Sequence, residues 1–290
     1  MLPVQNTLGE CVLWHEQQQA IYWLDIEGAT LQKHLVSTQQ IETFKLPFRA
    51  GCFAFLDNSH FPKDIIIAFA QGIARYNVQT EEINWLSQPE INILGNRFND
   101  GRADRQGRFW AGTMIEDSLN DEQQAHLYCL DHQLTCQKVI SEISISNSLC
   151  WSKNSKFLYH ADSQAHKIYQ YDFCQHTGNI SNKQLFAQTD DNAFPDGSTI
   201  DAQDHLWNAQ WGSSNVVRYN PKGEQDLVLT LPVTQPSCIA IGGPNLDWLI
   251  VSSARHSLSE QALKEQPLAG NIFIYQLHNI QGIPEPKCTI

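Results

Sequence analysis

The sequence predicts an all-β protein with the fold of a six-bladed β-propeller. Short, alternating and aromatic-rich stretches are broken by turn residues about every 8 to 12 residues, a pattern typical of consecutive antiparallel strands. One unit of this pattern recurs six times, starting at residues 12, 52, 101, 149, 198 and 238. These starts are 40 to 49 residues apart, which is the length of a four-stranded blade. A β-sandwich with coincidental spacing is the alternative, and the sixfold recurrence favours the propeller.

Each unit begins with an apolar strand, passes through a polar turn into a second strand, and ends in a strand that carries an aromatic or basic residue. The units span 12–34, 52–77, 101–131, 149–172, 198–220 and 238–277. Their most evident strand segments are, in order, AIYWLD (20–25), DIIIAFA (64–70), GRFWAGTM (107–114), HKIYQY (166–171), HLWNA (205–209) and CIAI (238–241). Only 118–124 and 257–263 resemble helices, and both lie in expected loops. The six units fill 1–290, so we expect a single propeller domain.

Composition and charge exclude several classes of function. The 290 residues carry 31 acidic and 19 basic side chains, for a net charge of −12, which disfavours binding to nucleic acid or to an anionic membrane surface. No apolar run approaches the length of a membrane span. The first residues lack the basic start and apolar stretch of a signal peptide. The eight cysteines are scattered without metal-binding spacing, so reduced thiols and a cytoplasmic location are expected.

Four oxygen-bearing side chains occupy the same position in the repeat. The segments that precede the first strand of each blade converge on one end of the central channel. Glu10, Asn99, Asn147 and Asp196 each lie shortly before such a strand. Each alone is typical of a turn, but their recurrence at one register indicates a shared site. Two carboxylates and two amide oxygens suit a divalent cation such as Ca²⁺.

These segments also carry a family resemblance. The runs RFNDGRAD (97–104) and GRFWAGTM (107–114), together with LGE (8–10), ISNSL (145–149) and PDG (195–197), resemble the SMP-30/gluconolactonase/regucalcin-like family along essentially the whole chain. The resemblance implies a six-bladed propeller and, for many members, metal-dependent hydrolysis of sugar lactones.

The resemblance also implies roles for individual residues. Glu10, Asn147 and Asp196 resemble the family's metal ligands. Arg97 resembles its substrate-binding arginine, and Asn99 a residue near both metal and substrate. Cys11-Val12 stands after Glu10, where the family has Gly-Pro, so the entry turn departs from the pattern. Glu116 and Asp117 lie where members vary, and we expect them to contact substrate and select among sugars.

The expected activity is the hydrolysis of an aldonolactone, such as gluconolactone, to its aldonic acid. One divalent ion (Ca²⁺, Zn²⁺, Mg²⁺ or Mn²⁺) would act as Lewis acid, and Asp196 as the general base that activates water. Two alternatives stay open. The same propeller could be a Ca²⁺-binding regulatory protein without turnover, or it could hydrolyse aryl esters or phosphotriesters at the same site.

Overall fold

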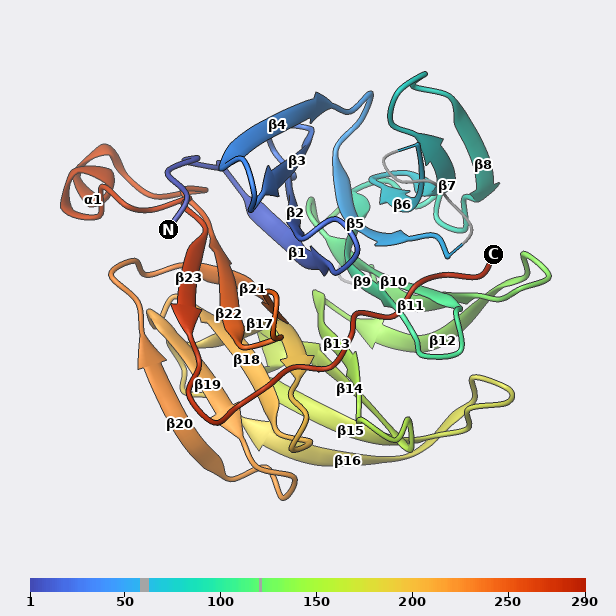
Figure 1. Cartoon of the computed structure of the whole chain (residues 1–290). Coiled ribbons are helices and arrows are strands. Elements are labelled where there is room, and N and C mark those ends of the chain that lie inside the picture. The colour runs from blue at the N-terminus through green and yellow to red at the C-terminus, as the bar shows by residue number, and fades with distance from the viewer. Residues whose placement is uncertain (58–62, 120–121) are drawn as a thin grey trace.

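The computed structural model contains six β-sheets arranged around a central axis, which confirms the predicted six-bladed propeller (Figure 1). It describes residues 1–57, 63–119 and 122–290. Five sheets have four antiparallel strands and the sheet nearest the C-terminus has three. We call the sheets blades 1 to 6 in chain order.

The strands follow one another in the sequence from the axis outward in every blade. Blade 1 comprises β1 (Gly9–His15), β2 (Ala20–Asp25), β3 (Thr30–Leu35) and β4 (Gln40–Lys45), and blade 2 comprises β5 (Ala50–Phe55), β6 (Asp64–Phe69), β7 (Gly72–Asn77) and β8 (Ile83–Ser87). Blade 3 comprises β9 (Asn96–Ala103), β10 (Phe109–Ile115), β11 (Ala125–Leu130) and β12 (Cys136–Ile143), and blade 4 comprises β13 (Ser146–Trp151), β14 (Phe157–Asp162), β15 (Lys167–Phe173) and β16 (Ile180–Gln188). Blade 5 comprises β17 (Phe194–Ile200), β18 (Leu206–Trp211), β19 (Asn215–Tyr219) and β20 (Gln225–Thr230), and blade 6 comprises β21 (Pro236–Gly242), β22 (Trp248–Ser253) and β23 (Phe273–Gln276).

Burial falls from the inner to the outer strand of a blade. Every residue of β5, β13 and β21 is buried, whereas β4 and β20 are almost entirely exposed. An inner strand is covered on both faces by neighbouring blades, so its sequence is a nearly continuous apolar run. An outer strand is exposed to water, so it contains many polar residues.

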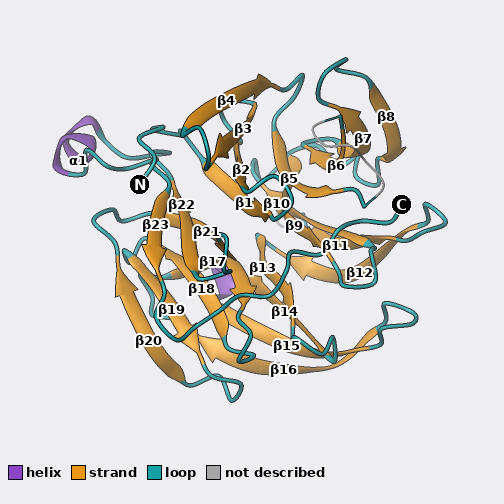
Figure 2. Cartoon of the chain, viewed as in Figure 1, coloured by secondary structure: helices purple, strands orange, loops and turns teal. Residues whose placement is uncertain are grey.

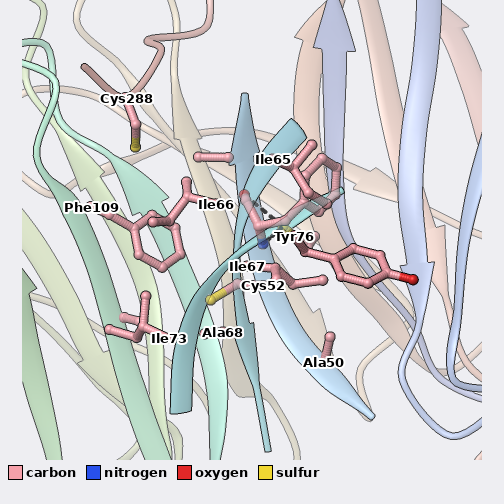
Figure 3. Packing of buried hydrophobic residues seen from close by; sticks show 14 of the residues in the cluster. Ala50, Cys52, Ile65, Ile66, Ile67, Ala68, Ile73, Tyr76, Phe109 and Cys288 are labelled. Atoms are coloured by element: carbon pink, nitrogen blue, oxygen red, sulfur yellow. Dashed lines mark hydrogen bonds between the residues drawn. The ribbon is translucent and has the colours of Figure 1, made fainter. Parts of the chain in front are cut away.

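Neighbouring blades pack through apolar side chains. In blade 2, Ile65, Ile66 and Ile67 of β6 lie in one buried cluster with Phe109 of blade 3 and Cys288 from the last residues of the chain (Figure 3). β-Branched side chains pack well on a pleated sheet. The cluster therefore joins blades 2 and 3 and anchors the C-terminal segment.

A repeated aspartate–tryptophan pair holds the turn between the first two strands of blades 3 and 5. Trp110 Nε1 donates to Asp104 Oδ2 at 3.0 Å, and Trp207 Nε1 donates to Asp201 Oδ2 at 3.0 Å. The second oxygen of each carboxylate accepts backbone N–H groups of its own turn. Both carboxylates are fully buried, and these bonds satisfy them in place of water. The pairs thus fix the ends of β9 and β17, whose opposite ends carry site residues.

The ring closes between blades 1 and 6. Leu2 pairs with Ile272 and Leu8 with Ala254, and the Asn6 N–H donates to the Gly270 carbonyl at 2.8 Å. Helical structure is sparse (Figure 2). The helix expected at 257–263 is the short α1 (Glu260–Glu265), while the described part of 118–124 is a loop and its residues 120–121 lie outside the described residues. Within the described ranges no helix has the length and apolarity needed to span a bilayer.

Candidate functional site

A cavity of about 290 Å³ lies at one end of the central channel. The innermost strands of the blades lie around the central axis of the propeller (Figure 1). The cavity is lined by Leu8, Glu10, Arg97, Asn99, Met114, Ile145, Asn147, Ser163, Gln164, Phe194, Asp196, Trp211 and His256. The four oxygen donors singled out in the sequence therefore meet in one cavity, together with Arg97.

A β-bulge recurs at the same point of five inner strands, which are β21 and the four strands that carry the oxygen-bearing side chains. In β1, residues Cys11 and Val12 stand opposite the single residue Trp23. Equivalent bulges lie at 99–100 in β9, 148–149 in β13 and 196–197 in β17. A bulge bends its strand and redirects the side chains beside it. Each donor lies within a bulge or immediately before one, so the bulges turn the donors toward the channel.

The bulges correct one detail of the sequence prediction. The donors were expected before their strands, but they lie within them, because a bulge lets pairing resume on both sides. Cys11 and Ser148 adopt left-handed backbone conformations with φ of 47° and 61°. At the corresponding point of β17, a Cβ on Gly197 would lie 2.7 Å from the Cα of Cys238. Glycine is therefore required after Asp196.

Without a cation, the acids of the cavity resist ionisation. Burial, and secondarily the nearby Asp100 carboxylate, raise the pKa of Glu10 to about 8. Burial, then Glu10 and Asp100, raise the pKa of Asp196 well above its ordinary value. Among the described residues, neither Glu10 nor Asp196 forms an ion pair with a basic side chain. A half-buried and a buried acid that lie close together without a counterion are both ionised only if a cation binds between them.

Hydrogen bonds orient the Asn147 side-chain amide, whose oxygen is a candidate cation ligand. Asn147 Nδ2 donates to Ser163 Oγ at 2.8 Å, and Asn99 Nδ2 donates to Asn147 Oδ1 at 3.1 Å. Ser163 Oγ donates in turn to the Pro195 carbonyl at 2.7 Å. The network fixes which end of the Asn147 amide is oxygen and ties blade 4 to the strand that carries Asp196.

Arg97 is held on the cavity wall by polar partners. Its Nη1 donates to Asn99 Oδ1 and its Nε to Glu116 Oε1, both at 2.9 Å. Glu116 also accepts two bonds from Arg49 at 2.8 and 2.6 Å. Burial alone would raise the pKa of Glu116, but the bonds from Arg49 and Arg97 outweigh it and the pKa is lowered. Glu116 therefore stays ionised and positions Arg97.

Glu116 and Asp117 are not among the residues that line the cavity. The backbone N–H groups of both donate to the Gly95 carbonyl, at 2.8 and 3.0 Å. Direct contact of these two side chains with substrate remains a prediction. Their observed contacts hold Arg97 and the loop beside it.

Sequence reasoning missed two parts of the site. Asp100 is not among the four residues that the repeat pattern singles out, but its carboxylate accepts the N–H groups of Gly101 and Leu149 and raises the pKa of both Glu10 and Asp196. The second part is an apolar wall formed by Leu8, Met114, Ile145, Phe194 and Trp211. Leu8, Met114 and Ile145 lie in the runs that carry the family resemblance, but the five residues come from distant segments, so the sequence did not show that their side chains share one cavity.

The donor set fits a hard divalent cation. The described residues contain no group of three or more His, Cys, Asp or Glu side chains arranged to hold a metal. The cavity instead offers two carboxylates and the Asn147 amide oxygen. Such all-oxygen sets, completed by water, suit Ca²⁺, Mg²⁺ and Mn²⁺. That Glu10 and Asp196 form no ion pair with any basic side chain in residues 1–57, 63–119 and 122–290 supports this fit.

Comparisons with known proteins show which family the chain resembles along most of its length. A family model described as the SMP-30/gluconolactonase/LRE-like region matches residues 8–255. The chain is 34% identical over 274 residues to an L-arabinolactonase of Azospirillum brasilense, covering 94% of this chain and 89% of the relative. It is 30% identical to a 6-deoxy-6-sulfogluconolactonase of Pseudomonas putida, covering 97% and 94% of the two chains. The crystal structure of a calcium-binding protein, regucalcin, from Agrobacterium tumefaciens superposes with a TM-score of 0.91 at 26% identity, covering 99% of this chain and 96% of that one.

Proposed function

Because the chain belongs to the SMP-30/gluconolactonase/LRE-like family, we propose that it is a divalent-cation-dependent sugar lactonase. The proposed reaction is the hydrolysis of an aldonolactone, such as gluconolactone, to its aldonic acid. The observation that carries the proposal is the acid pair Glu10 and Asp196, which shares a cavity with Arg97 and Asn99 and, within the described part of the chain, forms no ion pair. Relatives named as lactonases support the choice of substrate class.

In this proposal Glu10, Asn147 and Asp196 hold one divalent cation, which is Ca²⁺, Zn²⁺, Mg²⁺ or Mn²⁺. When bound, the cation supplies Lewis-acid polarisation of the lactone carbonyl and stabilises negative charge on its oxygen. Its positive charge also lowers the pKa of the neighbouring acids, so Asp196 is ionised in the loaded protein. The oxygen-rich donor set favours the harder ions of the four.

Asp196 is the proposed general base. Its carboxylate accepts a proton from water as the water oxygen bonds to the lactone carbonyl carbon. The bond between that carbon and the ring oxygen then breaks, and the proton passes to the ring oxygen, which becomes a hydroxyl group. Arg97 and Asn99 hold the hydroxyl groups of the substrate in place. The apolar wall packs against the carbon skeleton and limits the access of further water.

A panel of aldonolactones tests the proposal with metal-stripped protein. Chelation by EDTA is expected to abolish turnover above the spontaneous rate, and one of the four ions is expected to restore it. Hydrolysis of no aldonolactone, by protein that still binds Ca²⁺ in calorimetry, would overturn the enzyme assignment. That result would favour a Ca²⁺-binding regulatory propeller, a reading supported by the calcium-binding relative.

The apolar wall favours a second candidate reaction. Trp211, Phe194 and Met114 line the same cavity as the acids, and aromatic walls suit aryl leaving groups. A metal-dependent esterase or phosphotriesterase would use the same base and cation. Aryl esters and an organophosphate in the same panel distinguish this alternative, because it requires their turnover to exceed that of every lactone.

Replacing Arg97 with alanine is expected to raise the KM for lactone by at least about tenfold, since the change removes charge-assisted hydrogen bonds to bound substrate. We expect kcat to change less, because the base and the cation ligands remain. Steady-state kinetics at saturating metal measure both constants. Arg75→Ala is the control, because Arg75 pairs with Asp64 on the surface. A fall in kcat at unchanged KM would instead assign Arg97 to the transition state.

A further inference from the structure

The end of the channel opposite the cavity is crossed by residues 282–290, which we call the strap. Gly282 pairs with Asp201 of blade 5 and Cys288 pairs with Leu56 of blade 2. The Thr289 N–H donates to the Gly107 carbonyl of blade 3 at 3.0 Å. Figure 1 shows this segment, in dark red, passing across the inner strands toward the C-terminus. These contacts lie at the far ends of the inner strands, whereas the site residues lie at their beginnings.

Arg102 of β9 lies between the strap and the site. Its side chain is buried, and its Nη1 donates to the Ser198 carbonyl of blade 5 at 2.7 Å while its Nη2 donates to the Ile239 carbonyl of blade 6 at 3.4 Å. Its Nε lies 3.1 Å from Glu285 Oε1 of the strap. Both side chains of this ion pair are largely removed from water, with 9% and 14% exposed. Arg102 therefore ties three blades and the strap together across the channel.

The guanidinium of Arg102 lies close to the strand that carries Asp196, because its Nη1 donates to the Ser198 carbonyl, two residues after Asp196. Arg102 stands two residues after Asp100 on the same strand, and it opposes the burial that raises the pKa of Asp100. Asp100 in turn interacts with both Glu10 and Asp196. Charges inside a protein act over several ångströms with little screening. An uncompensated guanidinium here would repel a divalent cation in the site, and Glu285 compensates it.

We propose that Glu285 of the strap tunes the affinity of the site for its divalent cation by neutralising Arg102, which lies across the channel between the strap and the acids. Glu285 is thus a positioning and charge-balancing residue at the end of the channel opposite the substrate cavity. The inference rests on the proposed cation site. It gives the strap a role beyond packing, and it predicts that a change at one end of the propeller alters binding at the other.

The test is calorimetric titration of metal-stripped protein with Ca²⁺ and with Mn²⁺, without any lactone. Glu285→Gln preserves size and removes the charge, and we expect it to weaken cation binding by about tenfold. Glu285→Asp keeps the charge and should stay within about threefold of wild type. Asp57→Asn is the matched control, since Asp57 is an exposed acid beside the strap that faces Lys287 at 4.0 Å rather than Arg102. It should leave the affinity unchanged.

A second variant separates charge from detachment of the strap. Arg102→Met in the Glu285→Gln background removes the uncompensated cation and should restore affinity to within about threefold of wild type. Labelling of the buried Cys288 thiol reports whether the strap has lifted. Two results would overturn this inference but not the proposed function. One is a cation affinity of Glu285→Gln equal to that of wild type, and the other is a loss of affinity only in protein whose Cys288 has become reactive. Wild-type protein that binds neither ion overturns the proposed function as well.

Discussion

Replacing Asp196 with asparagine is expected to lower lactone hydrolysis by at least about 10²-fold at saturating metal, because general-base catalysis typically contributes 10²- to 10⁴-fold. Asparagine is nearly the same size as aspartate and keeps an oxygen that can face a cation, but it accepts no proton. Its backbone context should be preserved, since Ser148 Oγ and Asn208 Nδ2 bond the Asp196 carbonyl rather than its side chain. The fold should therefore survive the change.

The measurement is the steady-state rate on the best aldonolactone of the panel, with the spontaneous rate subtracted at each pH. Metal affinity also falls in Asp196→Asn, so rates must be compared where each protein is saturated. Asp191→Asn serves as the control, because Asp191 is an exposed acid on the loop before β17. Near-full activity of Asp196→Asn at saturation would show that the base assignment is wrong.

Replacing Glu10 with glutamine is expected to weaken divalent-cation binding by about 10²-fold, because one of two carboxylate ligands loses its charge in a poorly hydrated site. In the metal-free protein, by contrast, we expect Glu10→Gln to increase the stability of the fold at neutral and alkaline pH. Its raised Glu10 pKa of about 8 means that the folded state holds a proton that the unfolded state releases near its ordinary value of 4.5. This contribution to stability is present at low pH and is lost as the pH rises through 8. Glu10→Gln removes that loss.

Two experiments check the Glu10 prediction. Isothermal titration gives the affinity, with Glu16→Gln as the control because Glu16 is exposed beyond the other end of β1. Denaturation of metal-free protein between pH 5 and pH 9 gives the stability, and the wild type should lose more of it than Glu10→Gln. Unchanged cation affinity would remove Glu10 from the site. A pH profile shared by both proteins would contradict the raised pKa.

The sequence predicted the architecture because blade packing imposes a regular pattern on the chain. Each inner strand is covered on both faces, so continuous apolar segments such as β5 and β21 recur once per blade and can be counted. Glu10, Asn99, Asn147 and Asp196 recur at one register of that repeat, so their convergence followed from the propeller alone. The short helix near 257–263 was also expected, and its Ser259 cap, which accepts the Ala262 N–H at 3.1 Å, is a local signal.

Contacts between segments that are far apart in the sequence could not be predicted and are seen only in the folded protein. The β-bulges that turn the donors inward depend on pairing with a second strand, and Asp100 acquires its role only because it is buried beside two other acids. The apolar wall and the pairing of Arg102 with Glu285 join residues from opposite parts of the chain. Periodicity encodes burial within a segment, whereas electrostatic coupling depends on distances through space. The repeat pattern was therefore enough to predict the fold and the convergence of four oxygen-bearing side chains in one cavity, whereas packing in three dimensions sets the charges around them.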